Sequence, residues 1–207
     1  MTPEDQSRAE AEALDHARYI MWAYCDGMLR FDEQVIALKY VTDPASGRLF
    51  AAVPVAVTLA ADHVLYVPEE SDDALQLLLS CEECADCTTA DRWQMYHGTP
   101  DHVRWAAFWV DGARHGPWVF DGDALAEPNA LHHEEPALCK LANHDRVALA
   151  RACQQHAGVV VPDPVCVGVS PRGFHVRARF GIVSVRFEPE GREAANPRAA
   201  LERLLAP

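Results

Sequence analysis

The chain has 207 residues, 49% of them hydrophobic and 24% charged, and its 31 acidic and 18 basic residues give a formal net charge of −13. This composition is typical of a globular protein with one sizeable domain or two small ones, and the acidic balance argues against a nucleic-acid partner. No apolar run approaches the roughly 20 residues that span a bilayer, and the acidic start shows no signal-peptide pattern, so we expect a cytoplasmic protein without a membrane partner.

The N-terminal part predicts a helix followed by a meander of antiparallel strands. Apolar residues recur at helical spacing over residues 7–29, with Gly27 as the expected stop. Three runs typical of strands then cover residues 35–41, 48–60 and 64–68, and the turn-forming sequence "TDPASG" separates the first two. Pro54 lies inside the second run, which predicts an edge position or a bulge there.

A second helix and further strands are predicted before a linker. Residues 71–87 predict a helix with Ser71 as N-cap and leucines as its buried stripe. Residues 91–98 and 103–122 are rich in aromatic residues and valine, which favours two or three more strands. The segment 123–136 has few apolar anchors and two prolines, and we interpret it as a linker.

Beyond the linker the pattern changes. One long amphipathic helix is predicted over residues 135–158, with Gly158 closing it. Three strands are expected at 165–170, 173–180 and 182–189, the first pair joined by the turn "SPRG". A final helix begins at Pro197 with Asn196 as N-cap. The order of elements predicts an α+β protein with an N-terminal β-barrel-like domain and a small C-terminal α/β domain.

The C-terminal part resembles the small domain appended to haem-utilisation (HugZ-like) proteins. The resemblance rests on "LANHDRVAL" in a helix, the turn "SPRGFHVRA", the strand "VSVRFEPE" and the last helix "PRAALERLL", and it extends over most of residues 134–205. That domain opens with an Asn-x-Asp-His motif. Here the sequence Asn143-His144-Asp145 inverts the Asp-His pair and displaces the asparagine.

The N-terminal part is similar to the split barrel of pyridoxamine-phosphate-oxidase-like flavoproteins. Residues 37–78 follow that family's order of strand, turn, strand with an internal proline, strand and short helix. The two resemblances together imply a split β-barrel domain with an N-terminal helix at residues 1–127 and a HugZ-like α/β domain (helix, three antiparallel strands, helix) at 134–207. They also imply a homodimer that pairs through its barrel sheets.

The flavin-phosphate site of such barrels lies at the end of the third strand and the start of the next helix, where arginine, lysine and serine hold the phosphate. The matching segment here, residues 68–76, contains Ser71 and four carboxylates but no basic residue. Carboxylates repel a phosphate dianion, so we expect a degenerate FMN site. Bases from elsewhere in the fold are the candidates to compensate, namely Arg48, Arg92 and Arg104.

HugZ-like enzymes bind haem iron through a histidine near their C-terminus, and this tail contains none. His144 and His175 are the candidate haem ligands, with the His132-His133 pair in the linker as further candidates. A plant branch of the same architecture binds glutamyl-tRNA reductase without being an enzyme. We therefore expect a binding protein for a tetrapyrrole or a protein partner. Haem degradation or flavin-dependent oxidoreduction, with haem or FMN as cofactor, is the enzymatic alternative.

The heptapeptide "CEECADC" raises a second alternative, a thiol–metal site. Cys81, Cys84 and Cys87 have the spacing of thiolate ligands, and His97 is the nearest candidate for a fourth ligand. The competing interpretation is a helix end whose three thiols lie along one face. The seven cysteines form an odd number, which without an export signal predicts reduced thiols and no disulfide framework.

Overall fold

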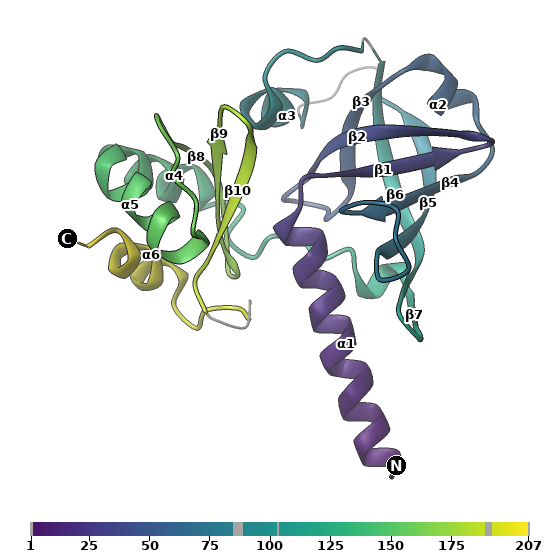
Figure 1. Cartoon of the computed structure of the whole chain (residues 1–207), viewed down its shortest axis with the longest axis horizontal. Coiled ribbons are helices and arrows are strands. Elements are labelled where there is room, and N and C mark those ends of the chain that lie inside the picture. The colour runs from purple at the N-terminus through teal and green to yellow at the C-terminus, as the bar shows by residue number, and fades with distance from the viewer. Residues whose placement is uncertain (1, 85–88, 103, 189–191, 207) are drawn as a thin grey trace. The chain divides into compact units, whose positions relative to one another are not determined.

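The computed structural model describes residues 2–84, 89–102, 104–188 and 192–206 and divides into two compact units, Met1–Pro128 and Asn129–Pro207. Each unit has its own hydrophobic core. Figure 1 shows a barrel with a long helix in the first unit, and helices α4, α5 and α6 with a small sheet in the second. The α+β fold class predicted from the sequence is confirmed. We call residues 1–128 the barrel unit and residues 129–207 the C-terminal unit.

In the described part of the barrel unit, seven antiparallel strands form one sheet, and six of them close into a barrel. The sheet order is β3-β2-β1-β4-β5-β6-β7, and an additional β3–β6 pairing closes it, so that β7 extends the sheet beyond β6. The strands are β1 (Asp26–Phe31), β2 (Gln34–Thr42), β3 (Leu49–Val53), β4 (His63–Val67), β5 (Leu75–Glu83), β6 (Arg104–His115) and β7 (Trp118–Asp121). This closed barrel with an extra strand fits a split-barrel fold.

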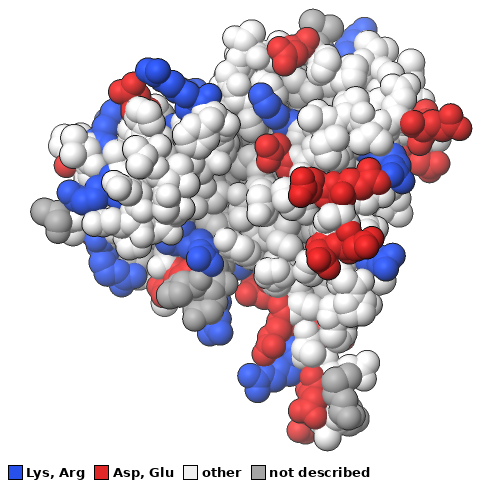
Figure 2. Space-filling model, in the orientation of Figure 1, with Lys and Arg blue, Asp and Glu red and all other residues white. Residues whose placement is uncertain are grey.

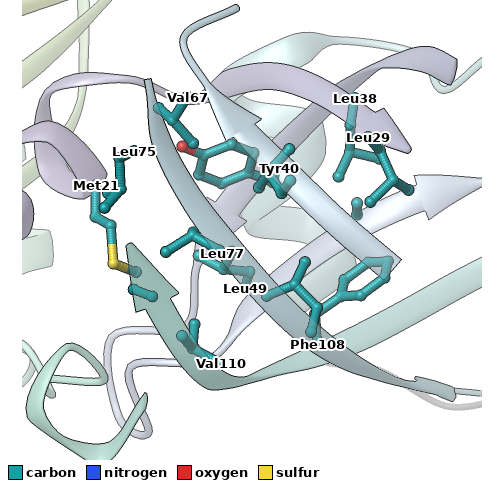
Figure 3. Packing of buried hydrophobic residues seen from close by; sticks show 14 of the residues in the cluster. Met21, Leu29, Leu38, Tyr40, Leu49, Val67, Leu75, Leu77, Phe108 and Val110 are labelled. Carbon is teal, nitrogen blue, oxygen red and sulfur yellow. The ribbon is translucent and has the colours of Figure 1, made fainter. Parts of the chain in front are cut away.

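The barrel interior is filled by aliphatic and aromatic side chains. Leu29, Leu49, Leu77 and Phe108 come from four different strands and are fully buried. Figure 3 shows Tyr40 among these residues, with its hydroxyl directed toward Val67. Every residue of β3 is buried, which shows that both faces of this strand are covered.

Helix α1 (Pro3–Ala23) begins with a capping box formed by Thr2 and Asp5. Near its C-terminal end, Arg18 donates a hydrogen bond to the carbonyl of Ala124 and forms an ion pair with Glu127 at 2.9 Å, and these contacts join the helix to the segment after β7. That segment opens with the short 3₁₀-helix η1 (Gly122–Ala124). In the described part of the chain, no helix combines the length and the apolar composition that crossing a bilayer requires.

The predicted helix at residues 71–87 is wrong, since residues 75–83 form strand β5. The helical interpretation placed Leu75, Leu78 and Leu79 on one face. The structure instead buries Leu75, Leu77 and Leu79 with a period of two and leaves Leu78 51% exposed. A run of leucines fits both periods, and pairing with β4 and β6 decides between them. Ser71 therefore caps no helix and lies in the loop between β4 and β5.

Three other local predictions for the barrel unit also differ from the structure. The strand expected over 48–60 stops at Val53, and Pro54 begins helix α2 (Val55–Leu59) because proline cannot donate to the sheet. The strand expected at 91–98 is helix α3 (Thr89–His97), which buries Trp93 and Tyr96 one turn apart. Helix α1 ends at Ala23, and Gly27 belongs to strand β1, which the sequence analysis did not separate from the helix.

The C-terminal unit combines three helices with a three-stranded antiparallel sheet, and helices and strands share one core. The sheet order is β10-β9-β8, with strands β8 (Val165–Ser170), β9 (Gly173–Ala178) and β10 (Gly181–Arg186). The helices are α4 (Glu135–His144), α5 (Arg146–Ala157) and α6 (Pro197–Leu205). The "SPRG" turn and the three strands are confirmed. So is the final helix, where the Asn196 side chain accepts from the Ala199 amide as N-cap.

The single long helix predicted over 135–158 is two helices. Asp145 has extended backbone angles and its side chain accepts hydrogen bonds from the amides of Val147 and Ala148, so it ends α4 and caps α5. Gly158 closes α5 in a left-handed conformation, as predicted.

Candidate functional site

The outer face of strands β3 and β6 carries the most distinctive group of side chains in the barrel unit. Along β6, Ala106, Phe108 and Val110 point into the core, while the alternate residues Trp105 and Trp109 are half-buried on the outside. Arg48 directly precedes β3, which pairs with β6. We refer to Arg48, Phe50, Trp105 and Trp109 as the β3–β6 outer face.

Arg48 and Trp109 form the exposed end of this face. The guanidinium carbon of Arg48 lies 4.2 Å from the centroid of the Trp109 ring, which is cation–π distance. The Arg48 side chain is exposed, and within the described ranges no carboxylate lies at ion-pair distance from it. The β2–β3 turn holds its backbone, because the Asp43 amide donates to the Arg48 carbonyl at 2.8 Å. An exposed guanidinium thus lies on an indole ring with no counter-ion among the residues that the structure describes.

The other end of the face is an aromatic cluster. Phe50 and Trp105 stack with ring centroids 5.3 Å apart and planes 15° apart, and Trp93 of α3 meets Trp105 edge-on at 5.6 Å. Trp93 also donates a hydrogen bond from its indole nitrogen to the Lys39 carbonyl at 2.9 Å. Helix α3 is therefore attached to the barrel through the rings that border this face.

Beside the face, strand β5 adds polar groups next to Trp109. Ser80 lies opposite Trp109 in the β5–β6 register, and its hydroxyl donates to a carboxylate oxygen of Asp111 at 2.6 Å. Half-exposed Ala107 lies between Trp105 and Trp109 on the same side of β6, so only a small methyl side chain separates the two indole rings. The face therefore combines two half-buried indole rings with one cation at its exposed end, and polar groups of Ser80 and Asp111 border it.

The remaining residues expected to bind a flavin phosphate do not converge with Arg48. Arg104 begins β6 and forms an ion pair with Glu83 at 2.8 Å, while Arg92 lies over the Tyr96 ring on α3 and donates to the Tyr96 hydroxyl. Ser71 is exposed in the acidic β4–β5 loop. Arg30 of β1, a base that the sequence analysis did not single out, pairs with Glu70 of that loop. Its charge is therefore already matched by a carboxylate.

Charge is distributed unevenly between the two units. The barrel unit has 23 acidic and eight basic residues, a formal charge of −15, whereas the C-terminal unit has eight acidic and ten basic residues, a formal charge of +2. On the face drawn in Figure 2, acidic groups outnumber basic ones over the barrel and α1, and basic side chains are frequent over the C-terminal unit. A strongly negative barrel disfavours polyanions, so an exposed base such as Arg48 is the kind of group that an anionic ligand of this unit would need.

The predicted thiol–metal residues lie on different elements. Cys81 belongs to strand β5 and Cys84 follows it, while Cys87 lies outside the described residues. Burial and the nearby Glu83 raise the pKa of Cys81 to about 11, which favours the thiol over the thiolate. In the described part of the chain, no three potential ligands are grouped as a metal ion requires.

His97 of α3 has a structural contact in the barrel unit. Its Nε2 lies 2.9 Å from the Tyr40 carbonyl, and burial lowers the pKa of His97 to about 4. At neutral pH the ring is uncharged, so the nitrogen facing the carbonyl carries the proton and donates the hydrogen bond.

The candidate haem histidines lie in the C-terminal unit. His144 is exposed at the C-terminal end of α4, and His175 is buried on strand β9. The rings of His132 and His133 are 3.7 Å apart, and His132 Nδ1 contacts the Asn129 carbonyl at 3.0 Å. These four histidines stay candidate ligands by resemblance alone.

Comparison with known proteins supplies a fold and no activity. No family model matches the chain, and no curated protein matches it. The chain is similar to the crystal structure of protein Atu2129 from Agrobacterium tumefaciens, a protein of unknown function, with a TM-score of 0.70 and 15% sequence identity. The similarity covers 100% of this chain and 98% of that chain, so the two-part architecture recurs as a whole.

Proposed function

We propose that the barrel unit is a binding module that holds a planar aromatic molecule with peripheral carboxylates, of the tetrapyrrole class, on the β3–β6 outer face. The observation that carries the proposal is the Arg48–Trp109 pair, in which an exposed guanidinium lies 4.2 Å from an indole centroid and has no carboxylate at ion-pair distance among the described residues. An indole surface stacks on a macrocycle, and a guanidinium forms charge-assisted hydrogen bonds with a carboxylate.

A tetrapyrrole fits the charge of this unit better than FMN does. A phosphate dianion needs several charge-assisted donors, but the loop around Ser71 is acidic and Arg30 is paired with Glu70. Tetrapyrrole carboxylates stay at the rim of the ligand, where one arginine and water satisfy them. The net charge of −15 also penalises a buried dianion more than it penalises exposed carboxylates.

The side chains of the β3–β6 outer face favour a binding protein over an enzyme. The side chains at the face, namely an arginine and aromatic rings, can orient and shield a ligand, but they include no group suited to proton transfer. We also propose that the protein is a homodimer and that it can bind a protein partner. A dimer would show in light scattering as two chains of 22.9 kDa each.

Titration with metal-free protoporphyrin IX tests this face directly, because that probe needs no axial ligand. We expect saturable quenching of tryptophan fluorescence. Trp109→Ala should weaken binding roughly tenfold, since aromatic stacking contributes about 0.5–1.5 kcal/mol and 1.4 kcal/mol is a factor of ten. Arg48→Gln should weaken it by a similar factor through the loss of a charge-assisted hydrogen bond.

Two exposed residues elsewhere provide matched controls. Arg8→Gln removes a charge from α1, and Phe180→Ala removes an exposed ring from the C-terminal unit; both should bind like the wild type. Equal affinity of the Arg48 and Trp109 variants and the wild type would refute the assigned surface. Tighter binding of FMN than of protoporphyrin would refute the ligand class. Haem that binds and then loses its Soret band with ascorbate in air would favour the degrading-enzyme alternative.

A further inference from the structure

Helix α4 presents a row of polar side chains to strand β8. Glu135, Cys139 and Asn143 are spaced four residues apart, so they lie on one face of the helix. Strand β8 is an edge of its sheet, and its outer backbone groups need partners. Glu135 accepts from the Val169 amide at 3.1 Å, and Asn143 both donates to the Cys166 carbonyl and accepts from the Cys166 amide, each at 2.8 Å.

This row places two thiols against each other. Cys139 lies one turn from each of the two anchoring residues, and its Sγ is 3.9 Å from Sγ of Cys166. The Asn143 bonds fix the backbone of Cys166 itself, so the spacing of the two sulfur atoms is held by contacts on both sides. A disulfide requires the sulfur atoms to approach to about 2.05 Å, so forming the bond draws them together by about 2 Å.

The two thiols differ in access to solvent. Cys139 is half-buried, whereas Cys166 is 2% exposed. A small oxidant therefore reaches Cys139 first. The hydrogen bond with Cys139 and then burial raise the pKa of Cys166 well above its ordinary value, so Cys166 stays a thiol until its neighbour has reacted. Cys153 of α5 lies fully buried in the same core and serves as an internal comparison.

We propose that Cys139 and Cys166 form a reversible thiol–disulfide site that responds to peroxide. The Cys139 thiolate attacks one peroxide oxygen, the O–O bond breaks, and hydroxide leaves to become water; Cys139 is then a sulfenic acid, and the peroxide has been reduced. Cys166 next gives up its proton and attacks the Cys139 sulfur. The S–O bond breaks and the hydroxyl leaves with that proton as water. In total two thiols and one peroxide give one disulfide and two waters, and an external dithiol reverses the change.

The disulfide would join α4 to the edge strand covalently. The two cysteines are 27 positions apart, and the closed loop contains the whole of α5. Cross-linking a loop of this length restricts the unfolded chain and stabilises the fold. Oxidation is therefore expected to raise the melting temperature of the C-terminal unit and to slow amide exchange in β8. The site is independent of the ligand proposed for the barrel unit.

Peptide mapping of the full chain after graded treatment with hydrogen peroxide tests the proposal. Free thiols are alkylated under denaturing conditions before digestion. We expect a peptide pair linked through Cys139 and Cys166 to appear, five of the seven cysteines to remain alkylated, and dithiothreitol to restore all seven. In a Cys166→Ser variant, Cys139 should stop at the sulfenic acid, which dimedone traps.

Two further variants test whether the linkage is specific to Cys139 and Cys166. Cys139→Ser should leave Cys166 reduced, and Cys153→Ala should still form the linked peptide. The proposal is overturned if both cysteines of the wild type stay alkylated at peroxide concentrations that oxidise the half-buried Cys81, or if Cys139 links to a cysteine other than Cys166. The wild-type map decides the question even if a serine variant fails to fold.

Discussion

Replacing Asn143 with alanine tests how the C-terminal unit is held together. The side chain makes two hydrogen bonds of 2.8 Å to the Cys166 backbone, and its removal leaves an amide and a carbonyl of the edge strand without these partners. An unsatisfied buried group costs about 1–3 kcal/mol, and the site is half-buried, so we expect a loss of about 2–4 kcal/mol in the free energy of unfolding. This is a large part of the stability of a small domain.

The assay must report on the C-terminal unit, and the sequence determines the probe. All five tryptophans precede residue 129, so tryptophan fluorescence follows the barrel unit alone. Hydrogen exchange at the amides of Val165–Ser170, measured at increasing urea concentration, follows the strand that Asn143 holds. We expect Asn143→Ala to speed exchange throughout β8, most strongly at the Cys166 amide.

An aspartate at position 143 sharpens the test. Asn143→Asp keeps the acceptor for the Cys166 amide but sets a carboxylate against the Cys166 carbonyl. This repulsion raises the folded-state pKa of the carboxyl above its unfolded value of about 3.9, so the variant gains stability as the pH falls. Gln154→Ala, at an exposed position of α5, is the control. If Asn143→Ala lost no more stability than Gln154→Ala, the two hydrogen bonds would not hold α4 to β8.

Two further predictions concern the barrel unit. The buried Tyr40 hydroxyl has no hydrogen-bond partner among the described residues, so Tyr40→Phe should raise the free energy of unfolding in urea by about 1 kcal/mol; destabilisation would instead reveal a bound water or another partner. Burial lowers the pKa of His97 from 6.5 to about 4. Between pH 6.5 and pH 4 the imidazole is therefore protonated in the unfolded chain but neutral in the folded chain. As the pH is lowered through this range, the free energy of unfolding should fall by up to about 1.4 kcal/mol per pH unit. His97→Gln should flatten this dependence, and parallel pH profiles for the variant and the wild type would contradict the assignment.

Local signals explain which elements the sequence predicted well. Asn196 before Pro197, Gly158 after α5 and the "SPRG" turn each act through backbone bonds within a few residues, and the structure contains all three. The leucines of β5 are different, because their spacing fits a helix and a strand equally and only pairing with β4 and β6 resolves it. Strand pairing, and not local spacing, therefore determines the secondary structure of this segment, on which the comparison with the flavin-phosphate site depended.

The candidate sites likewise combine features that a local pattern predicts with contacts that only the fold creates. The sequence suggests Arg48 only as a compensating base for a phosphate, although the alternation of residues 105–110 already places Trp105 and Trp109 on one face of a strand. The contact of Arg48 with Trp109 joins segments about 60 residues apart, and no local pattern predicts it. Cys139 and Cys166 likewise meet only because α4 packs on β8, whereas the more conspicuous "CEECADC" lies partly on a strand.

The inverted motif Asn143-His144-Asp145 shows where the search for function should start. Asn143 is occupied by the Cys166 backbone and Asp145 by the first amides of α5, so two of its three residues build the junction between α4, α5 and β8. Side chains committed to backbone groups in this way are poor candidates for binding a ligand, because recruiting them would break the fold. Arg48 has the opposite character, since it is exposed, stacked on Trp109 and without a carboxylate partner in the described ranges. Ligand-binding experiments should therefore begin at the β3–β6 outer face and not at the motif that the resemblance emphasises.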